Sequence, residues 1–234
     1  MSMTRRSLFF GAAALAGSAL AARAALAEDF IAQTEQLLNS LDGESPAPQA
    51  ESPIPQADSP VPQVDYPVPK VDLRVIPAEF RRQIVSYDGE QWPGTIIVDS
   101  EHRHLYKILG GGQAIRYGVG VGREGFGWSG LADVGAKQMW PEWNPPKEMV
   151  ARDVNAAKWA DGQPGGPDNP LGARALYLYQ DGRDTLYRIH GTNAPKSIGK
   201  AMSSGCIRML NQDVVELYRT TPIGTRVIVL PSSV

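Results

Sequence analysis

The stretch that decides the fold of this chain covers residues 189–211 and reads I-H-G-T-N-A-P-K-S-I-G-K-A-M-S-S-G-C-I-R-M-L-N. It contains the only cysteine, Cys206, together with His190 before it and Arg208 just after it. Residues 185–189 alternate and favour β-structure, and the residues that follow the stretch have helical spacing. We therefore expect His190 at the end of a strand and Cys206 on a loop or short strand close by.

These side chains have the chemistry of a nucleophilic site. Only a thiolate attacks efficiently, so Cys206 needs a neighbouring base or positive charge, and His190 can be that base. Arg208 keeps its proton at neutral pH, but its planar guanidinium can hold a carboxylate through two hydrogen bonds. Glycine permits close approach and unusual φ values, so the loop at Ser204 and Gly205 can direct backbone N–H groups at a developing oxyanion.

The motif H-G-T at residues 190–192, followed by S-x-G-C-I-R-M at residues 203–209, resembles the signature of the L,D-transpeptidase catalytic domain family (YkuD type). These are bacterial enzymes that cross-link or modify peptidoglycan through a cysteine acyl-enzyme. The resemblance implies that the Gly191 carbonyl orients the base. The chain departs from the usual family pattern at Ser204, where most members have histidine, so His190 is the only candidate base in the motif.

The resemblance also implies the reaction. The donor would be a peptidoglycan stem tetrapeptide that loses its terminal D-Ala from the L-centre of the diamino acid at position three. Four acceptors remain possible: a second stem peptide, a free D-amino acid, an envelope protein or water. With water as the acceptor the protein would be an L,D-carboxypeptidase. A catalytically silent peptidoglycan-binding module is the non-enzyme alternative. We also predict substrate-binding roles for Ser203, Asn211 and Trp128, in addition to Arg208.

Composition excludes several other classes. The 234 residues suffice for one globular domain with appendages, and the formal net charge of −2 does not indicate a nucleic-acid surface. A thiol redox protein usually carries C-x-x-C, which one cysteine cannot form. The other histidines, His102 and His104, lack the Cys or His partners of a metal site, so neither a metal nor a cofactor is expected.

The N-terminal residues 1–27 have the pattern of a twin-arginine-like signal peptide, with Arg5-Arg6, an apolar run and an A-x-A cleavage motif at residues 25–27. Arg23 interrupts the apolar run before it reaches the roughly 18 residues of a membrane span. We expect export to the periplasm or cell envelope, a mature chain beginning at Glu28 and no transmembrane span in it. Exported cysteines usually pair, so a single one is a candidate working thiol.

Three further segments precede the catalytic domain. Residues 28–43 form a short amphipathic segment. Residues 44–71 form a linker of four heptads, E-S-P-A-P-Q-A, E-S-P-I-P-Q-A, D-S-P-V-P-Q-V and D-Y-P-V-P-K-V. Two prolines per heptad favour polyproline II. Residues 72–93 form a lead-in, with a short helix expected over residues 74–84.

Residues 94–231 are expected to form the catalytic domain. Asn211 is predicted to be the N-cap of a helix that ends near Arg219, and the Gly-, Pro- and Trp-rich residues 126–172 are predicted to form a long irregular lid. The pattern is that of a mainly β fold, which the family resemblance sharpens to a β-sandwich or flattened barrel with one or two short helices. Strands are expected at residues 94–99, 104–109, 113–122, 173–180, 185–190 and 226–230.

Overall fold

A computed structural model describes residues 65–123, 127–203 and 205–231. The chain divides into two compact units, Met1–Ser45 and Pro46–Val234, and all described residues belong to the second. The predicted signal peptide, the segment 28–43, the first three heptads of the linker and Ser204 lie outside the described residues. No helix among the described residues is long and apolar enough to cross a membrane.

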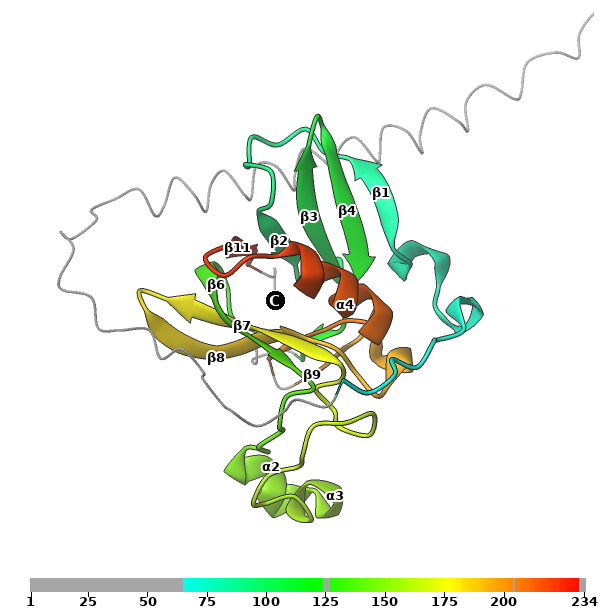
Figure 1. Cartoon of the computed structure of the whole chain (residues 1–234), viewed down its shortest axis with the longest axis vertical. Helices are drawn as coiled ribbons and strands as arrows, with labels where there is room; N and C mark the ends of the chain where they lie inside the picture. Colours follow the sequence, from blue (N-terminus) through cyan, green and yellow to red (C-terminus); the bar gives the residue numbers. More distant parts are fainter. Residues whose placement is uncertain (1–64, 124–126, 204, 232–234) are drawn as a thin grey trace, which may run out of the picture. The chain divides into compact units, whose positions relative to one another are not determined.

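The described unit is mainly β, as the sequence predicts (Figure 1). The helices are α2 (Lys147–Arg152), α3 (Val154–Ala157) and α4 (Asn211–Thr220). The strands are β1 (Gln83–Ser86), β2 (Ile96–Asp99), β3 (His104–Gly110), β4 (Gln113–Gly118), β5 (Val121–Gly122), β6 (Gly130–Met139), β7 (Arg174–Gln180), β8 (Arg183–His190), β9 (Ala201–Ser203), β10 (Ile207–Arg208) and β11 (Arg226–Val229).

Nine strands form one mixed sheet in the order β1-β4-β3-β2-β11-β6-β7-β8-β10, and β5 pairs with β9 in a small second sheet. Side chains from strands along the whole of the large sheet share one buried core. This core includes Val98 of β2, Leu178 of β7 and Val227 of β11. The layers expected of a sandwich are therefore two parts of one continuous sheet. All four residues of β2 are buried, since this strand lies between β3 and β11 near the middle of the sheet.

Helix α4 closes this core. Val214 and Leu217, three residues apart on one helix face, are fully buried and join the same cluster as the strands. Figure 1 shows α4 crossing the region between the β2–β4 strands and the β7–β8 hairpin. The helix therefore places its N-terminal end close to the chain segment that follows β8.

The helix expected at residues 74–84 is absent, and that prediction is wrong. Two short 3-10 turns occupy Leu73–Val75 and Ala78–Phe80, followed by the edge strand β1. Ile76 has extended backbone angles because the ring of a following proline, Pro77, disfavours the helical conformation in the residue before it. The predicted lead-in thus contributes a strand to the same sheet as the catalytic domain.

The segment 126–172 is not irregular throughout, which corrects the prediction of a long lid. It contains β6, a ten-residue strand that pairs with β11 on one side and β7 on the other. Alternate positions of β6 are buried at Gly130, Ala132 and Val134, a period-2 pattern that the glycine- and tryptophan-rich surroundings conceal. The remaining excursion between β6 and β7 covers residues 140–173 and carries α2 and α3.

The β7–β8 hairpin delivers His190 to its position. Asp181 and Gly182 both have positive φ, 50° and 72°, as a type I′ turn requires, and Gln180 pairs directly with Arg183. The loop is therefore two residues long, shorter than the predicted 181–184. At the other end of the hairpin His190 pairs with Ala175.

Candidate active site

The predicted reactive residues lie on two paired segments near the end of β8. Strand β10 runs parallel to β8, with Ile207 opposite Ile189 and Arg208 opposite His190. The Met209 amide donates to the His190 carbonyl at 2.8 Å. Cys206, a free and half-buried cysteine, immediately precedes β10. Parallel pairing is what brings together residues that are well separated along the chain.

The His190 ring is buried and hydrogen-bonded through Nδ1 to the backbone. Its Nδ1 lies 2.6 Å from the carbonyl oxygen of Gly191, which can only accept, so Nδ1 carries the proton and Nε2 has the lone pair in the neutral ring. Burial, helped by the positive charge of Arg208, lowers the pKa of His190 to about 4, against the opposing backbone hydrogen bonds of Gly191 and Leu171. At neutral pH His190 is therefore an uncharged proton acceptor.

The Gly191 carbonyl is itself held in place by its neighbours. The Gly191 amide donates to the Arg174 carbonyl at 3.0 Å, and the Asn211 Oδ1 accepts from the amides of Ala173 and Thr192 at 3.0 and 3.1 Å. A Cβ at Gly191 would lie 2.1 Å from the Asn211 Oδ1, so only glycine fits here. Asn211 thus braces the loop that orients His190.

Asn211 is not the N-cap of α4, contrary to the sequence prediction. The N-cap position is Leu210, and Asn211 is the first helical residue. Its side chain is turned away from the helix because it serves the two backbone amides of the neighbouring loop. Asn211 is also only 5% exposed, so its carboxamide is used inside the protein.

Ser203 organises the loop that carries Cys206. Its buried hydroxyl donates to the Cys206 carbonyl at 2.6 Å and accepts from the Gly205 amide at 3.2 Å. Gly205 has φ of 123°, a conformation that residues with a Cβ rarely adopt. In this structure the Gly205 N–H is therefore engaged within the loop. Ser204, predicted to share the oxyanion role with Gly205, lies outside the described residues.

The Cys206 thiol faces the carbonyl of Leu186, which lies 4.0 Å from Sγ. Burial raises the pKa of the Cys206 thiol, while the backbone of Arg188 and the charges of Arg188 and Arg208 act in the opposite direction. With the pKa of the thiol raised and the pKa of His190 lowered, both side chains are uncharged at neutral pH.

Sequence reasoning missed a β-bulge in β8 beside the thiol. The pairing with β7 shifts between Tyr177 and Tyr179, and Leu186 in the bulge has φ of 64°, which is strained for a residue of its size. The Asp184 carboxylate holds the bulge, since it accepts from the Leu186 amide at 2.8 Å and from both terminal nitrogens of Arg188 at 2.6 and 2.7 Å. The only signal in the sequence was an acid at the end of the predicted loop, Asp184, four residues before an arginine in the predicted strand, Arg188.

Arg208 is half-buried, and no ion pair involves it within the described residues. Its backbone is fixed by two hydrogen bonds to Gly120, at 2.7 and 2.9 Å. Burial lowers the pKa of the Arg208 guanidinium, and the neighbouring Cys206 acts in the opposite direction. A partly buried guanidinium without a carboxylate has spare capacity for an anionic ligand.

Trp128 belongs to the surroundings of the thiol through Tyr187. The two rings lie 5.5 Å apart at an interplanar angle of 31°. Burial raises the pKa of the Tyr187 phenol, and the charge of an ionised Cys206 raises it further. Both aromatic residues also pack against the main core, so Trp128 has a structural role in addition to any contact with a ligand.

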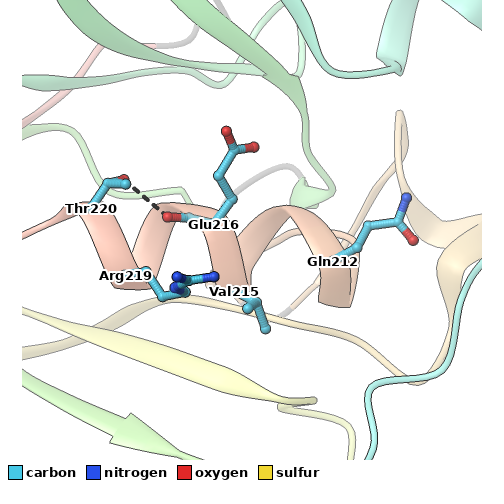
Figure 2. A pocket seen from close by; sticks show the side chains of 5 residues that line it. All are labelled: Gln212, Val215, Glu216, Arg219 and Thr220. Carbon is cyan, nitrogen blue, oxygen red and sulfur yellow. Dashed lines mark hydrogen bonds between the residues drawn. The ribbon is translucent and has the colours of Figure 1, made fainter.

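Two surface depressions lie away from this site. One is on the outer face of α4 and is lined by Gln212, Val215, Glu216, Arg219 and Thr220 (Figure 2). The other lies at the β3–β4 turn around the glycines at positions 110–112. In the part of the chain that the structure describes, no group of three or more His, Cys, Asp or Glu side chains is arranged to hold a metal ion.

Comparisons with known proteins identify a family. Residues 93–229 match the L,D-transpeptidase catalytic domain family (YkuD). "Probable L,D-transpeptidase YbiS" of Escherichia coli K12 is 38% identical over 139 residues, which cover 57% of this chain and 43% of YbiS. "Probable L,D-transpeptidase ErfK/SrfK" of Salmonella typhimurium is 36% identical over 138 residues, or 56% of this chain and 42% of that protein.

A solved structure from Brucella melitensis, named as a probable carnitine operon oxidoreductase, is 45% identical with a TM-score of 0.46, and the match covers 69% of this chain and all of that one. The chain spans less than half of the length of the two curated relatives.

Proposed function

Because the chain belongs to the L,D-transpeptidase catalytic domain family (YkuD), we propose that it is a peptidoglycan L,D-transpeptidase that acts through an acyl-enzyme on Cys206. The observation that supports the proposal is the neutral His190 ring, whose Nδ1 is hydrogen-bonded to the Gly191 carbonyl, at the end of strand β8, which pairs with the strand that directly follows the free Cys206. This arrangement leaves Nε2 as the proton acceptor that a neutral thiol needs.

The proposed first half-reaction forms a thioester. The Cys206 sulfur attacks the carbonyl carbon at the L-centre of the diamino acid in the donor stem peptide, and His190 Nε2 takes the thiol proton. The bond to the nitrogen of the terminal D-Ala then breaks, and the imidazolium returns the proton to the leaving amine. The buried site favours return of the proton, since burial keeps the pKa of His190 low.

In the second half-reaction an acceptor amine attacks the thioester carbonyl. His190 takes a proton from that amine, the carbon–sulfur bond breaks, and the imidazolium returns the proton to the leaving thiolate, which restores the thiol and the neutral ring. The acceptor remains one of the group expected from sequence: a second stem peptide, a free D-amino acid or an envelope protein. Water in the same place would make the protein an L,D-carboxypeptidase.

Arg208 is proposed to bind the donor. Its guanidinium has no carboxylate partner among the residues described, and it lies on β10 directly after the nucleophile. The carboxylate of the terminal D-Ala would supply the missing anion in a two-pronged contact. Ser203 supports the loop geometrically and Trp128 lines the surroundings, while Asn211 is proposed to position the His190 loop.

Intact mass after incubation with a carbapenem, an acylating β-lactam, tests the proposal. We expect one adduct, mapped by peptide analysis to Cys206, in the wild-type protein and none in Cys206→Ala. Cys206→Ser has nearly the same shape but a far higher pKa, so it should resemble the alanine variant. An adduct at another residue, or none at all, would favour the silent peptidoglycan-binding module instead. Muropeptide analysis of treated sacculi then identifies the acceptor.

We also propose that the protein works in the periplasm or cell envelope. The support is the twin-arginine-like pattern of residues 1–27 together with the peptidoglycan substrate class of the family. N-terminal sequencing of the exported protein should find Glu28 as the first residue. A first residue at Met1 in membrane fractions would indicate an anchor.

A further inference from the structure

The last heptad of the linker contacts the catalytic domain. Residues 65–71, here called the docked repeat, read D-Y-P-V-P-K-V and run without helix or strand. The Asp65 carboxylate accepts from the indole nitrogen of Trp140 at 3.0 Å and from the Arg174 guanidinium at 3.0 and 3.1 Å. Arg174 is only 7% exposed, so a nearly buried cation finds its counter-ion in the linker.

Two more positions of the docked repeat make contacts. The Tyr66 ring meets the edge of Trp140, with centroids 5.5 Å apart and the planes at 83°. At the other end the Val71 amide donates to the Gln212 Oε1 at 3.3 Å, and the Val71 side chain packs on the small cluster around Leu210. Prolines between these contacts limit φ, so the segment loses little conformational freedom on docking.

These contacts fall on the supports of the His190 loop. Trp140 and Arg174 stand at the two ends of the 140–173 excursion, which the Trp140 amide closes by donating to the Ala173 carbonyl at 2.8 Å. The Arg174 carbonyl accepts from the Gly191 amide, and the Gly191 carbonyl accepts from His190. A continuous chain of hydrogen bonds and covalent links therefore joins Asp65 to the candidate base.

The four heptads are not equivalent at the position that meets Trp140. All begin with an acidic residue, so position one does not distinguish them. Position two is serine in the first three heptads, Ser45, Ser52 and Ser59, and tyrosine only in the fourth, Tyr66. A serine cannot supply the ring contact, so the surface formed by Trp140 and Arg174 selects the fourth heptad.

We propose that the Trp140–Arg174 surface is a recognition site for an acidic–aromatic–proline segment, occupied by the chain's own fourth heptad, and that Asp65 is a positioning residue for the His190 loop. The first three heptads then act as the spacer, and the catalytic unit begins at Asp65. Recognition itself is independent of the chemistry at Cys206. The coupling to catalysis rests on the proposed function.

Hydrogen exchange of the full-length protein, read by mass spectrometry, tests the docking. In Asp65→Asn and in Tyr66→Ser we expect the amides of Trp140 and Gly191 to exchange about tenfold faster, because local opening becomes easier when the docked repeat is released. Asp58→Asn, the same change at position one of the third heptad, is the matched control and should exchange like the wild type. Asp65→Glu keeps the charge and should restore part of the protection.

Carbapenem acylation of the same proteins tests the coupling. We expect acylation of Cys206 to slow several-fold in Asp65→Asn and Tyr66→Ser but not in Asp58→Asn, with deletion of residues 44–64 leaving the rate unchanged. Unchanged exchange in both variants, or equal changes in the control, would overturn the recognition site. Faster exchange with unchanged acylation would overturn the positioning role. Absence of acylation in the wild type would refute the proposed function, while the exchange comparison still decides the docking.

Discussion

Both ends of α4 lie against polar side chains, but the two groups of side chains differ in how much of their hydrogen-bonding capacity is used. At the N-terminal end, Asn211 braces the loop after β8, where the Gly191 carbonyl accepts from the Nδ1 of His190 and Arg208 has no carboxylate partner among the described residues. At the C-terminal end, Lys107 and Lys137 bind the last carbonyls of the helix. Cations favour this end of a helix because of its dipole.

The C-terminal end is saturated. The three donors of the Lys107 ammonium reach the Thr220 carbonyl, the Thr220 hydroxyl and the Thr221 hydroxyl. Lys137 donates to the carbonyls of Tyr218 and Thr221 at 2.6 and 2.7 Å. No donor of Lys107 is left over for a ligand, which makes this cluster structural.

Burial lowers the pKa of a basic side chain at each end of α4, to about 4 for His190 and to about 8 for Lys107. A perturbed pKa alone therefore does not identify the active site. The distinguishing property is unused hydrogen-bonding capacity next to the free Cys206. The same criterion excludes the depression on the outer face of α4 (Figure 2), which no predicted reactive residue lines.

The largest effect should come from His190. Replacement by alanine removes the proton acceptor, so acylation of Cys206 should slow by about 10²–10⁴-fold. His190→Gln is the control of similar size and should be nearly as slow. Stopped-flow acylation measures both. A decrease of less than about threefold in either variant would be too small for loss of a general base. It would also mean that the two ends of α4 do not differ in their importance for the reaction.

The pH dependence of the same residue sharpens this test. The pKa of His190 falls from 6.5 unfolded to about 4 folded, so between these values the unfolded chain binds more protons. The free energy of unfolding should therefore be highest above pH 6.5 and decrease as pH falls toward 4, by on the order of 3 kcal/mol. Denaturant titrations of wild type and His190→Gln measure the difference, and parallel curves would contradict the burial argument.

Arg208→Lys should have the next largest effect. Lysine keeps the charge but loses the planar fork, so donor turnover should fall by roughly 10–100-fold, mainly through weaker donor binding. Steady-state kinetics with a soluble tetrapeptide separates KM from kcat. Lys107→Arg, at the saturated end, is the matched control and should leave both constants unchanged. Normal kinetics in Arg208→Lys would leave the guanidinium a structural role.

Asn211→Ala should have a smaller effect, expressed first in stability. The amides of Ala173 and Thr192 lose their shared acceptor, which should cost about 1–3 kcal/mol of unfolding free energy. Acylation should slow as well, because the Gly191 carbonyl loses its support. Asn211→Asp keeps the acceptor and should retain more of both. A loss of stability with a normal acylation rate would mean that the hydrogen bonds of Asn211 stabilise the fold but do not contribute to the reaction.

The smallest effect on activity should come from Lys107→Met, which leaves the active site untouched. Its signature is in stability against pH: the pKa of Lys107 is lowered from 10.5 to about 8, so the unfolded chain binds more protons between these values. Wild type should gain stability relative to Lys107→Met as pH rises from 8 to 10.5, by on the order of 1–3 kcal/mol. A stability difference that does not change with pH would mean that burial does not disfavour the charged form of Lys107. Slower acylation in Lys107→Met would mean that the C-terminal end of α4 affects the active site.

Local patterns predicted much of this molecule. The strands β2, β3, β7 and β11 and the helix α4 follow period-2 and helical spacing, and the turn glycines mark their ends. The motif around Cys206 was sufficient to name the family, and its histidine and arginine are neighbours because β8 and β10 pair. Strand β6 was missed because the glycines and tryptophans around it obscure its alternating pattern. Pairing with β11 on one side and β7 on the other is what makes this segment a strand.

The sequence by itself determined the reactive residue types, the mainly β class and the heptads of the linker, since each is written in local order and composition. Tertiary structure decided which polar groups are satisfied: Asn211 as a brace instead of a cap, Ser203 inside the nucleophile loop, and Asp65 on Arg174. The partners of Asn211 and Asp65 are distant in sequence, and those of Ser203 are brought together only by the shape of its loop. A hydrogen bond depends on distance and direction in space, which residue spacing does not encode.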